Sequence, residues 1–307
     1  MIMTSENDSS RLAPLIVAKV GSNAITTVLG DGTQSVDPQK VAEIAYGINI
    51  AREGGYRVIL VTSGAVAGGM YKQHFAKRPG VGENTRLSSL AAIGQTQLMH
   101  LYSEAFEKHD ICVAQGLPTQ DDFHRAVVHD HMRDTLNDLL SLGVVPILNE
   151  NDFTSFAEMR FGDNDTIAAL VAILCEAQHL VLFTVEDGIM SANPNHDEHA
   201  VLVEEINDLN ISMFDEDQEK SAAGSGGINS KLFAGDIARY SGIQTSITHV
   251  DSAENLLDVV SGNLKCSRFF VREIKPLSIL DACEIVKIQS QARENPFFDV
   301  GEYLSNK

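Results

Sequence analysis

The stretch that decides the fold runs from Val144 to Pro194 and reads VVPILNENDFTSFAEMRFGDNDTIAALVAILCEAQHLVLFTVEDGIMSANP. It begins with an apolar, β-branched run at 144–148, which predicts a strand. A helical run over 166–177 and a second strand over 179–184 follow, and each strand opens into an acidic loop. This order predicts a βαβ unit. Because ligands bind where the parallel strands of open α/β sheets end, we expect these acidic loops to form a functional site.

The rest of the chain alternates strands and helices in the same way. Besides the two strands above, apolar runs predict strands at 15–20, 57–62, 111–116 and 243–248. Helical spacing or capping signals predict helices at 38–52, 88–109, 124–141, 230–240, 253–260 and 276–292. Six strands that alternate with helices favour an α/β fold with a mostly parallel sheet covered on both faces.

Composition narrows the classes of partner. The 307 residues carry a formal net charge of −19, which argues against a nucleic acid or a membrane surface as partner. Four cysteines lie far apart with no C-x-x-C pair, so we expect buried thiols in a reducing, cytoplasmic compartment. The first ten residues do not resemble a signal peptide, and no apolar run is long enough to span a membrane. Residues 1–13 are predicted to be a disordered tail.

Three segments have features of anion-binding sites. Lys19 ends the first strand and is followed by Gly21, the small residues of 63–69 follow the strand at 57–62, and a Gly-rich segment at 224–231 leads into a helix and ends at Lys231. Glycine amides and a helix N-terminus favour phosphate groups. Each segment also has a structural explanation that stays open here: an ordinary strand-end lysine, close packing of the next helix, and a flexible hinge.

Other known motifs are absent or weak. The sequence has no G-x-x-x-x-G-K-[ST] segment and no G-x-G-x-x-G after the first strand, so neither a P-loop nor a dinucleotide fold is expected. His129 and His131 could suggest a metal pair, but two imidazoles without clustered ligands make a poor site, and we expect them to be solvated.

The charged residues of these segments suit phosphoryl transfer. Two lysines, Lys19 and Lys231, neutralise a transferring phosphate, while Asp163 and Asp165 hold Mg²⁺ or orient the lysines. Glycine amides would contact the remaining phosphate oxygens. Positioning and electrostatics supply most of the catalysis in such reactions.

Six segments of the chain resemble the glutamate 5-kinases, a branch of the amino-acid kinase family, over about 230 residues. The matching segments, in the order of that family, are VAKVGSNAIT (17–26), VILVTSGAVAGG (58–69), LAAIGQTQLMHLYSEAF (90–106), VVPILNENDF (144–153), RFGDNDTIAALVAIL (160–174) and GSGGINSKLFAGDIARYSGI (224–243). The resemblance implies a three-layer αβα sandwich with a mainly parallel, roughly eight-stranded sheet. It also implies transfer of the ATP γ-phosphate to the γ-carboxylate of L-glutamate, with Mg²⁺, as the first step of proline synthesis.

The resemblance assigns roles residue by residue. The implied catalytic residues are Lys19, Lys231, Asp163 and Asp165, and the two aspartates are also the implied metal ligands. The implied substrate contacts are Ser63, Gly64, Asn149, Asp152 and Asn164, with Glu150 in the same loop. The implied nucleotide contacts are Lys19, Gly21, Thr184, Val185, Ser225, Gly226, Gly227, Ile228, Asn229, Ser230 and Lys231.

Several residues depart from the family pattern, mostly on the nucleotide side. Val185 stands where an aspartate is usual, and Met190, Asn193 and Ile228 also differ. Two alternatives to glutamate phosphorylation therefore stay open: a kinase of the same fold for another small carboxylate or carbamate, and a non-catalytic paralogue that senses glutamate or proline. The intact lysines and aspartates argue against the second alternative.

The remaining expectations concern organisation and partners. We expect a kinase domain over 14–264 and a C-terminal extension over 265–307, which is too short for the PUA domain of many bacterial relatives. The resemblance further implies a homodimer or homotetramer, feedback inhibition by proline and γ-glutamyl phosphate reductase as a partner. Glu158 is a candidate for sensing proline, which an alanine substitution that leaves inhibition unchanged would exclude.

Overall fold

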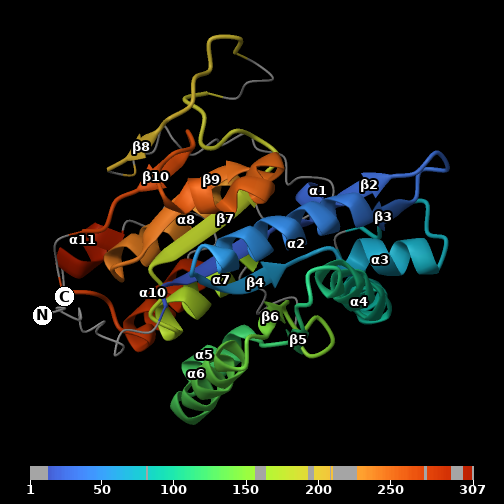
Figure 1. Cartoon of the computed structure of the whole chain (residues 1–307), viewed down its shortest axis with the longest axis horizontal. Coiled ribbons are helices and arrows are strands. Elements are labelled where there is room, and N and C mark those ends of the chain that lie inside the picture. The colour runs from blue at the N-terminus through green and yellow to red at the C-terminus, as the bar shows by residue number, and fades with distance from the viewer. Residues whose placement is uncertain are drawn as a thin grey trace, which may run out of the picture.

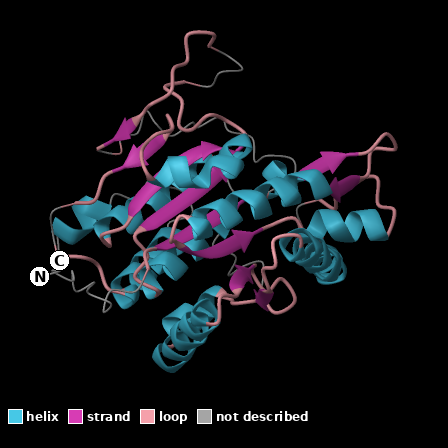
Figure 2. Cartoon of the chain, viewed as in Figure 1, coloured by secondary structure: helices cyan, strands magenta, loops and turns pink. Residues whose placement is uncertain are grey.

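The computed structural model describes residues 13–80, 82–155, 164–192, 197–207, 209, 227–272, 275–291 and 300–305. An eight-stranded sheet lies at the centre, with the strand order β5-β6-β4-β1-β7-β9-β10-β8 (Figure 1). All of its strand pairs are parallel except β9 with β10. Helices flank the sheet, and a short hairpin, β2–β3, forms a separate two-stranded sheet (Figure 2). The predicted α/β class with a mostly parallel sheet is confirmed.

The described strands are β1 (Leu15–Val20), β2 (Thr26–Val28), β3 (Gln34–Val36), β4 (Arg57–Thr62), β5 (Val113–Gly116), β6 (Val145–Leu148), β7 (His179–Thr184), β8 (Glu205–Ile206), β9 (Gln244–His249) and β10 (Ser267–Phe269). The described helices are α1 (Ser22–Ile25), α2 (Pro38–Glu53), α3 (Ala65–Lys72), α4 (Asn84–Glu107), α5 (Gln120–His124), α6 (Ala126–Ser141), α7 (Asn164–Leu174), α8 (Ile228–Tyr240), the 3₁₀ helix η2 (Val250–Asn255), α9 (Leu256–Val260), α10 (Ile279–Gln291) and α11 (Val300–Ser305).

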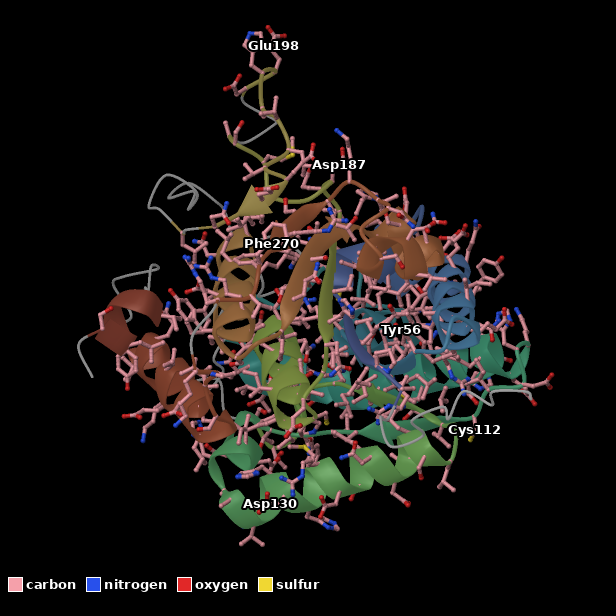
Figure 3. The ribbon with its side chains drawn as sticks, turned by 60° about the vertical axis from the view of Figure 1, so that its left-hand side comes forward. Tyr56, Cys112, Asp130, Asp187, Glu198 and Phe270 are labelled. Atoms are coloured by element: carbon pink, nitrogen blue, oxygen red, sulfur yellow. The ribbon has the colours of Figure 1, made fainter. Side chains whose placement is uncertain are left out.

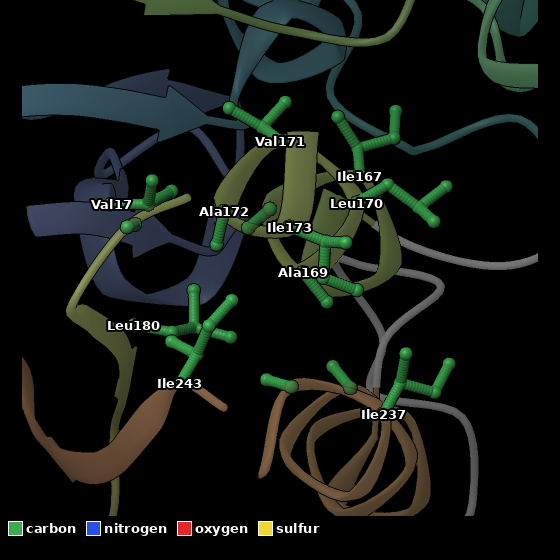
Figure 4. Packing of buried hydrophobic residues seen from close by; sticks show 14 of the residues in the cluster. Val17, Ile167, Ala169, Leu170, Val171, Ala172, Ile173, Leu180, Ile237 and Ile243 are labelled. Atoms are coloured by element: carbon green, nitrogen blue, oxygen red, sulfur yellow. The ribbon is translucent and has the colours of Figure 1, made fainter. Parts of the chain in front are cut away.

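Two hydrophobic cores, one on each face of the sheet, make the fold a three-layer sandwich. Successive side chains of a strand point to opposite faces. Accordingly, Leu15 and Val17 of β1 join the core formed with α7, α8 and α10, whereas Ile16 and Ala18 join the core formed with α2, α4 and α9. Figure 4 shows the first of these cores, where residues of α7 lie near Val17 and Leu180 of the strands and Ile237 belongs to the neighbouring α8.

This alternation along β1 also places a charged residue. Lys19 has the same parity as Leu15 and Val17, so its side chain points to the face covered by α7 and α8. The lysine is nearly fully buried, with 2% of its surface exposed. A buried ammonium needs a counter-charge. The residue that supplies it must therefore come from the α7–α8 layer.

All six strands predicted from apolar runs are present, and sequence reasoning missed the shortest ones. β8 and β10 have two and three residues, and the β2–β3 hairpin has three residues in each strand. Runs this short have too few side chains to show a period of two. β10 is held by its pairing with β9 on one side and β8 on the other, which involves distant parts of the chain.

The predicted helix over 124–141 is wrong as one continuous element. Arg125 is extended, with φ −100° and ψ 101°, and separates α5 from α6. A capping box starts α5: the backbone N–H and the hydroxyl of Thr119 both donate to Asp122 Oδ2, at 2.7 and 2.8 Å. The actual helical segment therefore begins four residues earlier than predicted and breaks after one turn.

The small-residue segment after β4 is a helix from Ala65 onwards. Its glycines serve helix packing: a Cβ on Gly69 would lie 1.9 Å from the carbonyl oxygen of Leu90, and a Cβ on Gly94 would lie 1.8 Å from that of Ala65. The backbones of α3 and α4 are therefore in direct contact. Of the two explanations left open for this segment, close packing of the next helix is the one that the structure bears out for Gly69.

The cysteines are free thiols, as expected. Cys175, Cys266 and Cys283 are buried, and burial raises the pKa of Cys175 and of Cys283 to about 12. Cys112 is exposed, so the prediction of burial was wrong for this residue, which immediately precedes the edge strand β5. None of the described helices has both the length and the apolar character that crossing a bilayer requires.

The prediction of two solvated histidines was wrong for His129. His131 is exposed, but His129 is buried, because the latter lies on the inner side of α6. Within the described part of the chain, no group of three or more histidine, cysteine or acidic residues is arranged to hold a metal.

The peripheral segments extend from the main body. Glu198 lies near the tip of a segment that projects away from the sheet, while Asp130 on α6 lies at the opposite end of the molecule (Figure 3). Beyond residue 264, β10 joins the main sheet and α10 packs against α7. The predicted tail at 1–13 lies almost wholly outside the described residues, and the domain boundaries stay a prediction.

Candidate active site

A buried cluster of two lysines and one aspartate forms the centre of the site. Lys19 Nζ lies 2.6 Å from Asp165 Oδ1, and Lys231 Nζ lies 3.0 Å from Asp165 Oδ2. The exposed fractions of the side chains are 2% for Lys19, 8% for Lys231 and 0% for Asp165. One carboxylate therefore holds two ammonium groups, one at each oxygen.

Three elements bring this cluster together. Lys19 is the fifth residue of β1, Asp165 is in the first turn of α7 and Lys231 is in the first turn of α8. An acidic residue is favourable at the start of a helix, because the helix dipole is positive there. A lysine at the start of α8 is unfavourable for the same reason. Its ion pair with Asp165 offsets that cost.

Ser230 ties the start of α8 to the same carboxylate. Its hydroxyl lies 2.9 Å from Asp165 Oδ2 and 2.9 Å from the carbonyl oxygen of Gly227. Asp165 Oδ2 therefore receives contacts from two neighbouring residues of α8, Ser230 and Lys231. Ser230 was predicted as a nucleotide contact, and the structure adds a role in holding Asp165.

A second cluster, made of polar groups, lies beside the first because Asn164 directly precedes Asp165. Asn164 Nδ2 is 2.9 Å from the carbonyl oxygen of Thr62, 2.8 Å from Ser63 Oγ and 3.0 Å from Asn149 Oδ1. Its two hydrogens serve three acceptors, so one hydrogen is shared. On its other side, Asn164 Oδ1 accepts from the backbone N–H of Glu150 at 3.2 Å.

This arrangement sets the direction of the Ser63 hydroxyl. Because Asn164 Nδ2 can only donate, Ser63 Oγ acts as the acceptor and its own hydrogen points elsewhere. Among the described residues, no acceptor for that hydrogen is found. The hydroxyl can therefore donate to an anionic ligand such as a carboxylate.

The loop after β6 is held against the loop after β5. The N–H of Asn149 donates to the carbonyl of Gly116 at 3.1 Å, and the N–H of Asn151 donates to that of Pro118 at 3.0 Å. The N–H of Asp152 donates to the carbonyl of Glu150 at 3.0 Å, which turns the chain. Asp152 is half-buried.

The strand that carries Thr62 is fixed from behind by α4. Thr62 Oγ1 and the Tyr102 hydroxyl are 2.8 Å apart, and Tyr102 is fully buried. Burial raises the pKa of Tyr102 well above its usual value, so its hydroxyl stays neutral. Gly64 follows at φ +100°, a conformation that glycine adopts readily and that starts α3 immediately after Ser63.

The predicted nucleotide contacts are described only in part. Gly21 lies beside the lysine of β1, since a Cβ there would be 3.3 Å from Lys19 Nζ. Thr184 ends β7 next to His249 of β9, and Val185 is 43% exposed. Gly227, Ile228 and Asn229 start α8, while Asp163, Ser225 and Gly226 lie outside the described residues, as do Glu158 and Asn193.

Sequence reasoning missed one member of the polar cluster, Gln95 of α4. Its Oε1 accepts from Asn149 Nδ2 at 2.8 Å. The residue lies in the segment LAAIGQTQ, which was among those that resemble the family, but its sequence neighbours gave no sign of a role. Only the tertiary packing of α4 brings it to Asn149.

The geometry is that of a site for transferring a phosphoryl group to a small polar acceptor. Two ammoniums and one carboxylate leave a local charge of about +1 at a buried position in a chain whose net charge is −19.

Comparison with known proteins agrees with this interpretation. The sequence profile of the amino acid kinase family matches residues 14–249. The chain belongs to the amino acid kinase family.

Relatives with curated names narrow the group within the family. The chain is 38% identical to a glutamate 5-kinase of Herpetosiphon aurantiacus, over 83% of this chain and 67% of that protein. It is 37% identical to a glutamate 5-kinase of Gloeobacter violaceus, over 83% and 68%, and 34% identical to glutamate 5-kinase 1 of Bacillus subtilis, over 80% and 66%. The chain thus spans about two thirds of the length of these relatives.

Solved structures of the family share the fold. A carbamate kinase from Giardia lamblia superimposes with a TM-score of 0.59 at 16% identity, covering 85% of this chain and 99% of that one. An isopentenyl phosphate kinase gives a TM-score of 0.56 at 14% identity, covering 83% and 99%. At these identities the likeness concerns the fold alone.

Proposed function

We propose that the chain transfers the γ-phosphoryl group of ATP to the γ-carboxylate of L-glutamate, which gives γ-glutamyl 5-phosphate and begins proline biosynthesis. The observation that carries this proposal is the Lys19–Asp165–Lys231 cluster directly beside Ser63, Asn149 and Asn164. The glutamate 5-kinase relatives support the choice of glutamate over carbamate or another carboxylate.

In the proposed reaction, a γ-carboxylate oxygen of glutamate attacks the γ-phosphorus. The new O–P bond forms as the bond from that phosphorus to the β–γ bridging oxygen breaks, and ADP leaves with the electron pair. The carboxylate is already ionised, so no proton has to move. Lys19 and Lys231 stabilise the charge on the transferring group, and Asp165 keeps both ammoniums in place.

The amino acid is proposed to bind at the polar cluster. The Ser63 hydroxyl donates to a substrate carboxylate, because Asn164 occupies its acceptor side. Asp152 is suited to the α-ammonium group, since it is a half-buried carboxylate on the same loop as Asn149. Gly64 allows the chain to turn into α3 beside the bound substrate. Fixing both reactants in this way supplies the alignment that the reaction needs.

The nucleotide is proposed to bind along the starts of α7 and α8 and the end of β7. Its contacts are Gly21, Thr184, Val185 and the segment 225–231, with the helix N-terminus of α8 facing phosphate oxygens. Mg²⁺ bound with ATP would neutralise charge on the phosphates. Both oxygens of Asp165 already contact lysines, so ATP oxygens and Asp163 are the better ligands, and Asp165 would contribute by sharing an oxygen.

Several expectations about partners belong to the same proposal. A cytoplasmic location, a homodimer or homotetramer, inhibition by proline and channelling to γ-glutamyl phosphate reductase follow from the resemblance to glutamate 5-kinases. Free thiols fit a reducing compartment.

The test is carboxylate-dependent release of ADP from MgATP, with hydroxylamine to trap the acyl phosphate. L-Glutamate is compared with L-aspartate, N-acetyl-L-glutamate and carbamate. We expect turnover with glutamate that Lys231→Ala abolishes, because the variant loses one of the two charges at the transferring group. Lys265→Ala is the matched control, since Lys265 is 81% exposed and pairs with Glu204. Turnover with carbamate but not glutamate would contradict the proposal.

A further inference from the structure

The side-chain amides of Asn164, Asn149 and Gln95 form a relay whose direction is set by the backbone. Asn164 lies between the carbonyl of Thr62, which only accepts, and the N–H of Glu150, which only donates. Its Nδ2 must therefore face Thr62 and its Oδ1 must face Glu150. No rotation of this amide satisfies both neighbours in another way.

The orientation of Asn164 determines that of Asn149. Because Asn164 Nδ2 points at Asn149, the atom that meets it is Oδ1, at 3.0 Å. The Nδ2 group of Asn149 is then turned to α4 and needs an acceptor, since Asn149 is 3% exposed. Gln95 Oε1 supplies that acceptor at 2.8 Å.

The end of the relay is an unsatisfied donor. With Oε1 committed to Asn149, the Nε2 group of Gln95 is left with two hydrogens. It is buried, and among the described residues it has no hydrogen-bond partner. Rotating the Gln95 amide would only place two N–H donors against each other. A buried donor without an acceptor pays its desolvation cost uncompensated, so a ligand that supplies an acceptor binds more favourably there.

We infer that Gln95 Nε2 donates to a carboxylate oxygen of the bound amino-acid substrate, which makes Gln95 a specificity-determining residue of the site. This inference rests on the proposed function, because the ligand is taken to be glutamate. Two features favour a carboxylate as acceptor. Gln95 is hydrogen-bonded directly to Asn149, which is an implied substrate contact. The Ser63 hydroxyl, which is hydrogen-bonded to Asn164 of the same relay, is a second donor for the same ligand.

Two substitutions of Gln95 separate its donor from its acceptor. Gln95→Glu keeps the acceptor for Asn149 and replaces the donor with a charged oxygen, whereas Gln95→Met removes both. The KM for glutamate, the KM for MgATP and kcat are measured for each by the hydroxylamine assay, and thermal melting checks folding. Gln115→Glu, at an exposed position of β5, is the matched control for added charge.

We expect Gln95→Glu to raise the KM for glutamate about tenfold to a hundredfold, the range that corresponds to losing a hydrogen bond to a charged group. The KM for MgATP should change little, and Gln95→Met should fall between Gln95→Glu and the unaltered chain. The inference would be overturned if Gln95→Glu had the same KM for glutamate as the unaltered chain. It would also be overturned if the KM for glutamate and the KM for MgATP rose by equal factors. Failure of the unaltered chain to use glutamate would refute the proposed function instead.

Discussion

At the scale of single residues, the site depends on Asp165 more than on any other side chain described. Both of its oxygens contact ammonium groups and one also receives a hydroxyl, although the residue is wholly buried. A lone carboxylate at such a position would be costly, and so would either lysine without it. The contacts that balance charge at this buried position are therefore the same contacts that hold both lysines of the candidate site in place.

This charge balance predicts that Asp165→Asn lowers both the stability of the protein and its turnover. The two ammoniums lose their counter-charge, so the free energy of unfolding should fall by about 3–5 kcal/mol, as for other broken buried ion pairs. Turnover should fall as well, because the lysines are no longer held in position. Urea denaturation and the ADP-release assay measure the two effects. Asp134→Asn, at a position 70% exposed, is the control and should change neither.

Sequence reasoning at this scale found the charged residues and two of the amides, Asn149 and Asn164, but missed the third amide, Gln95. Lys19, Asp165 and Lys231 were expected to act together, and the structure places each lysine Nζ within 3.0 Å of an Asp165 carboxylate oxygen. The resemblance to the glutamate 5-kinases assigned these roles, because each charged segment taken alone also had an ordinary structural explanation. Gln95 went unassigned, because a glutamine on a helix is commonplace and its partner is 54 residues away.

At the scale of elements, the contact between α3 and α4 positions the polar side chains at which the amino-acid substrate is proposed to bind. α3 starts directly after Ser63, and α4 carries Gln95 and Tyr102. The two helices approach closely enough that Gly69 and Gly94 have no room for a side chain. The separation of these helices therefore determines where Gln95 and Ser63 lie.

Gly94→Ala should consequently destabilise the protein despite the better helix propensity of alanine. The added Cβ would lie 1.8 Å from the carbonyl oxygen of Ala65, a backbone atom that can move only with its helix. We expect the free energy of unfolding to fall by about 1–3 kcal/mol, as in other overpacked cores. The KM for glutamate should rise as well.

Gly30→Ala is the matched control for that substitution. A Cβ at Gly30 meets nothing within 4 Å, so its stability should stay within about 0.5 kcal/mol of the unaltered chain. Equal stabilities of the Gly94→Ala and Gly30→Ala variants in urea denaturation would show that α3 and α4 can separate at little cost.

At the scale of the whole molecule, stability depends on groups far from the site. His179 starts β7 with its ring near that of Tyr56, at 6.0 Å between centroids, and burial lowers its pKa below the usual value. Burial also lowers the pKa of His124 at the end of α5. The folded chain therefore keeps both imidazoles neutral to a lower pH than the unfolded chain does.

The sign of the pH dependence follows from this difference. Below the unfolded pKa of about 6.5, the unfolded chain binds protons that the folded chain does not, so stability falls as the pH falls. Above that pH, the contribution is fully present. His179→Gln should reduce the loss of stability between about pH 7.5 and 5.5 in urea denaturation, and adding His124→Gln should reduce it further. An unchanged loss in the double variant would contradict this account.

The sequence by itself determined the local features of this protein. Apolar runs gave the six longer strands, including β1 with Lys19 near its end. Capping signals placed the start of α2, where Asp37 accepts from the N–H of Gln39 at 2.9 Å. These features depend on residues a few positions apart, whose relation is set by backbone geometry alone.

Only the tertiary structure decided which distant groups meet. It packs the small residues after β4 against α4, and it brings the Ser230 hydroxyl to the Asp165 carboxylate. It also brings Gln95 to Asn149, where the relay of amides ends. Each of these contacts joins segments that the order of strands in the sheet and the packing of helices bring together. Spacing along the chain carries no record of such contacts, because the residues concerned keep the same local pattern whether or not they touch.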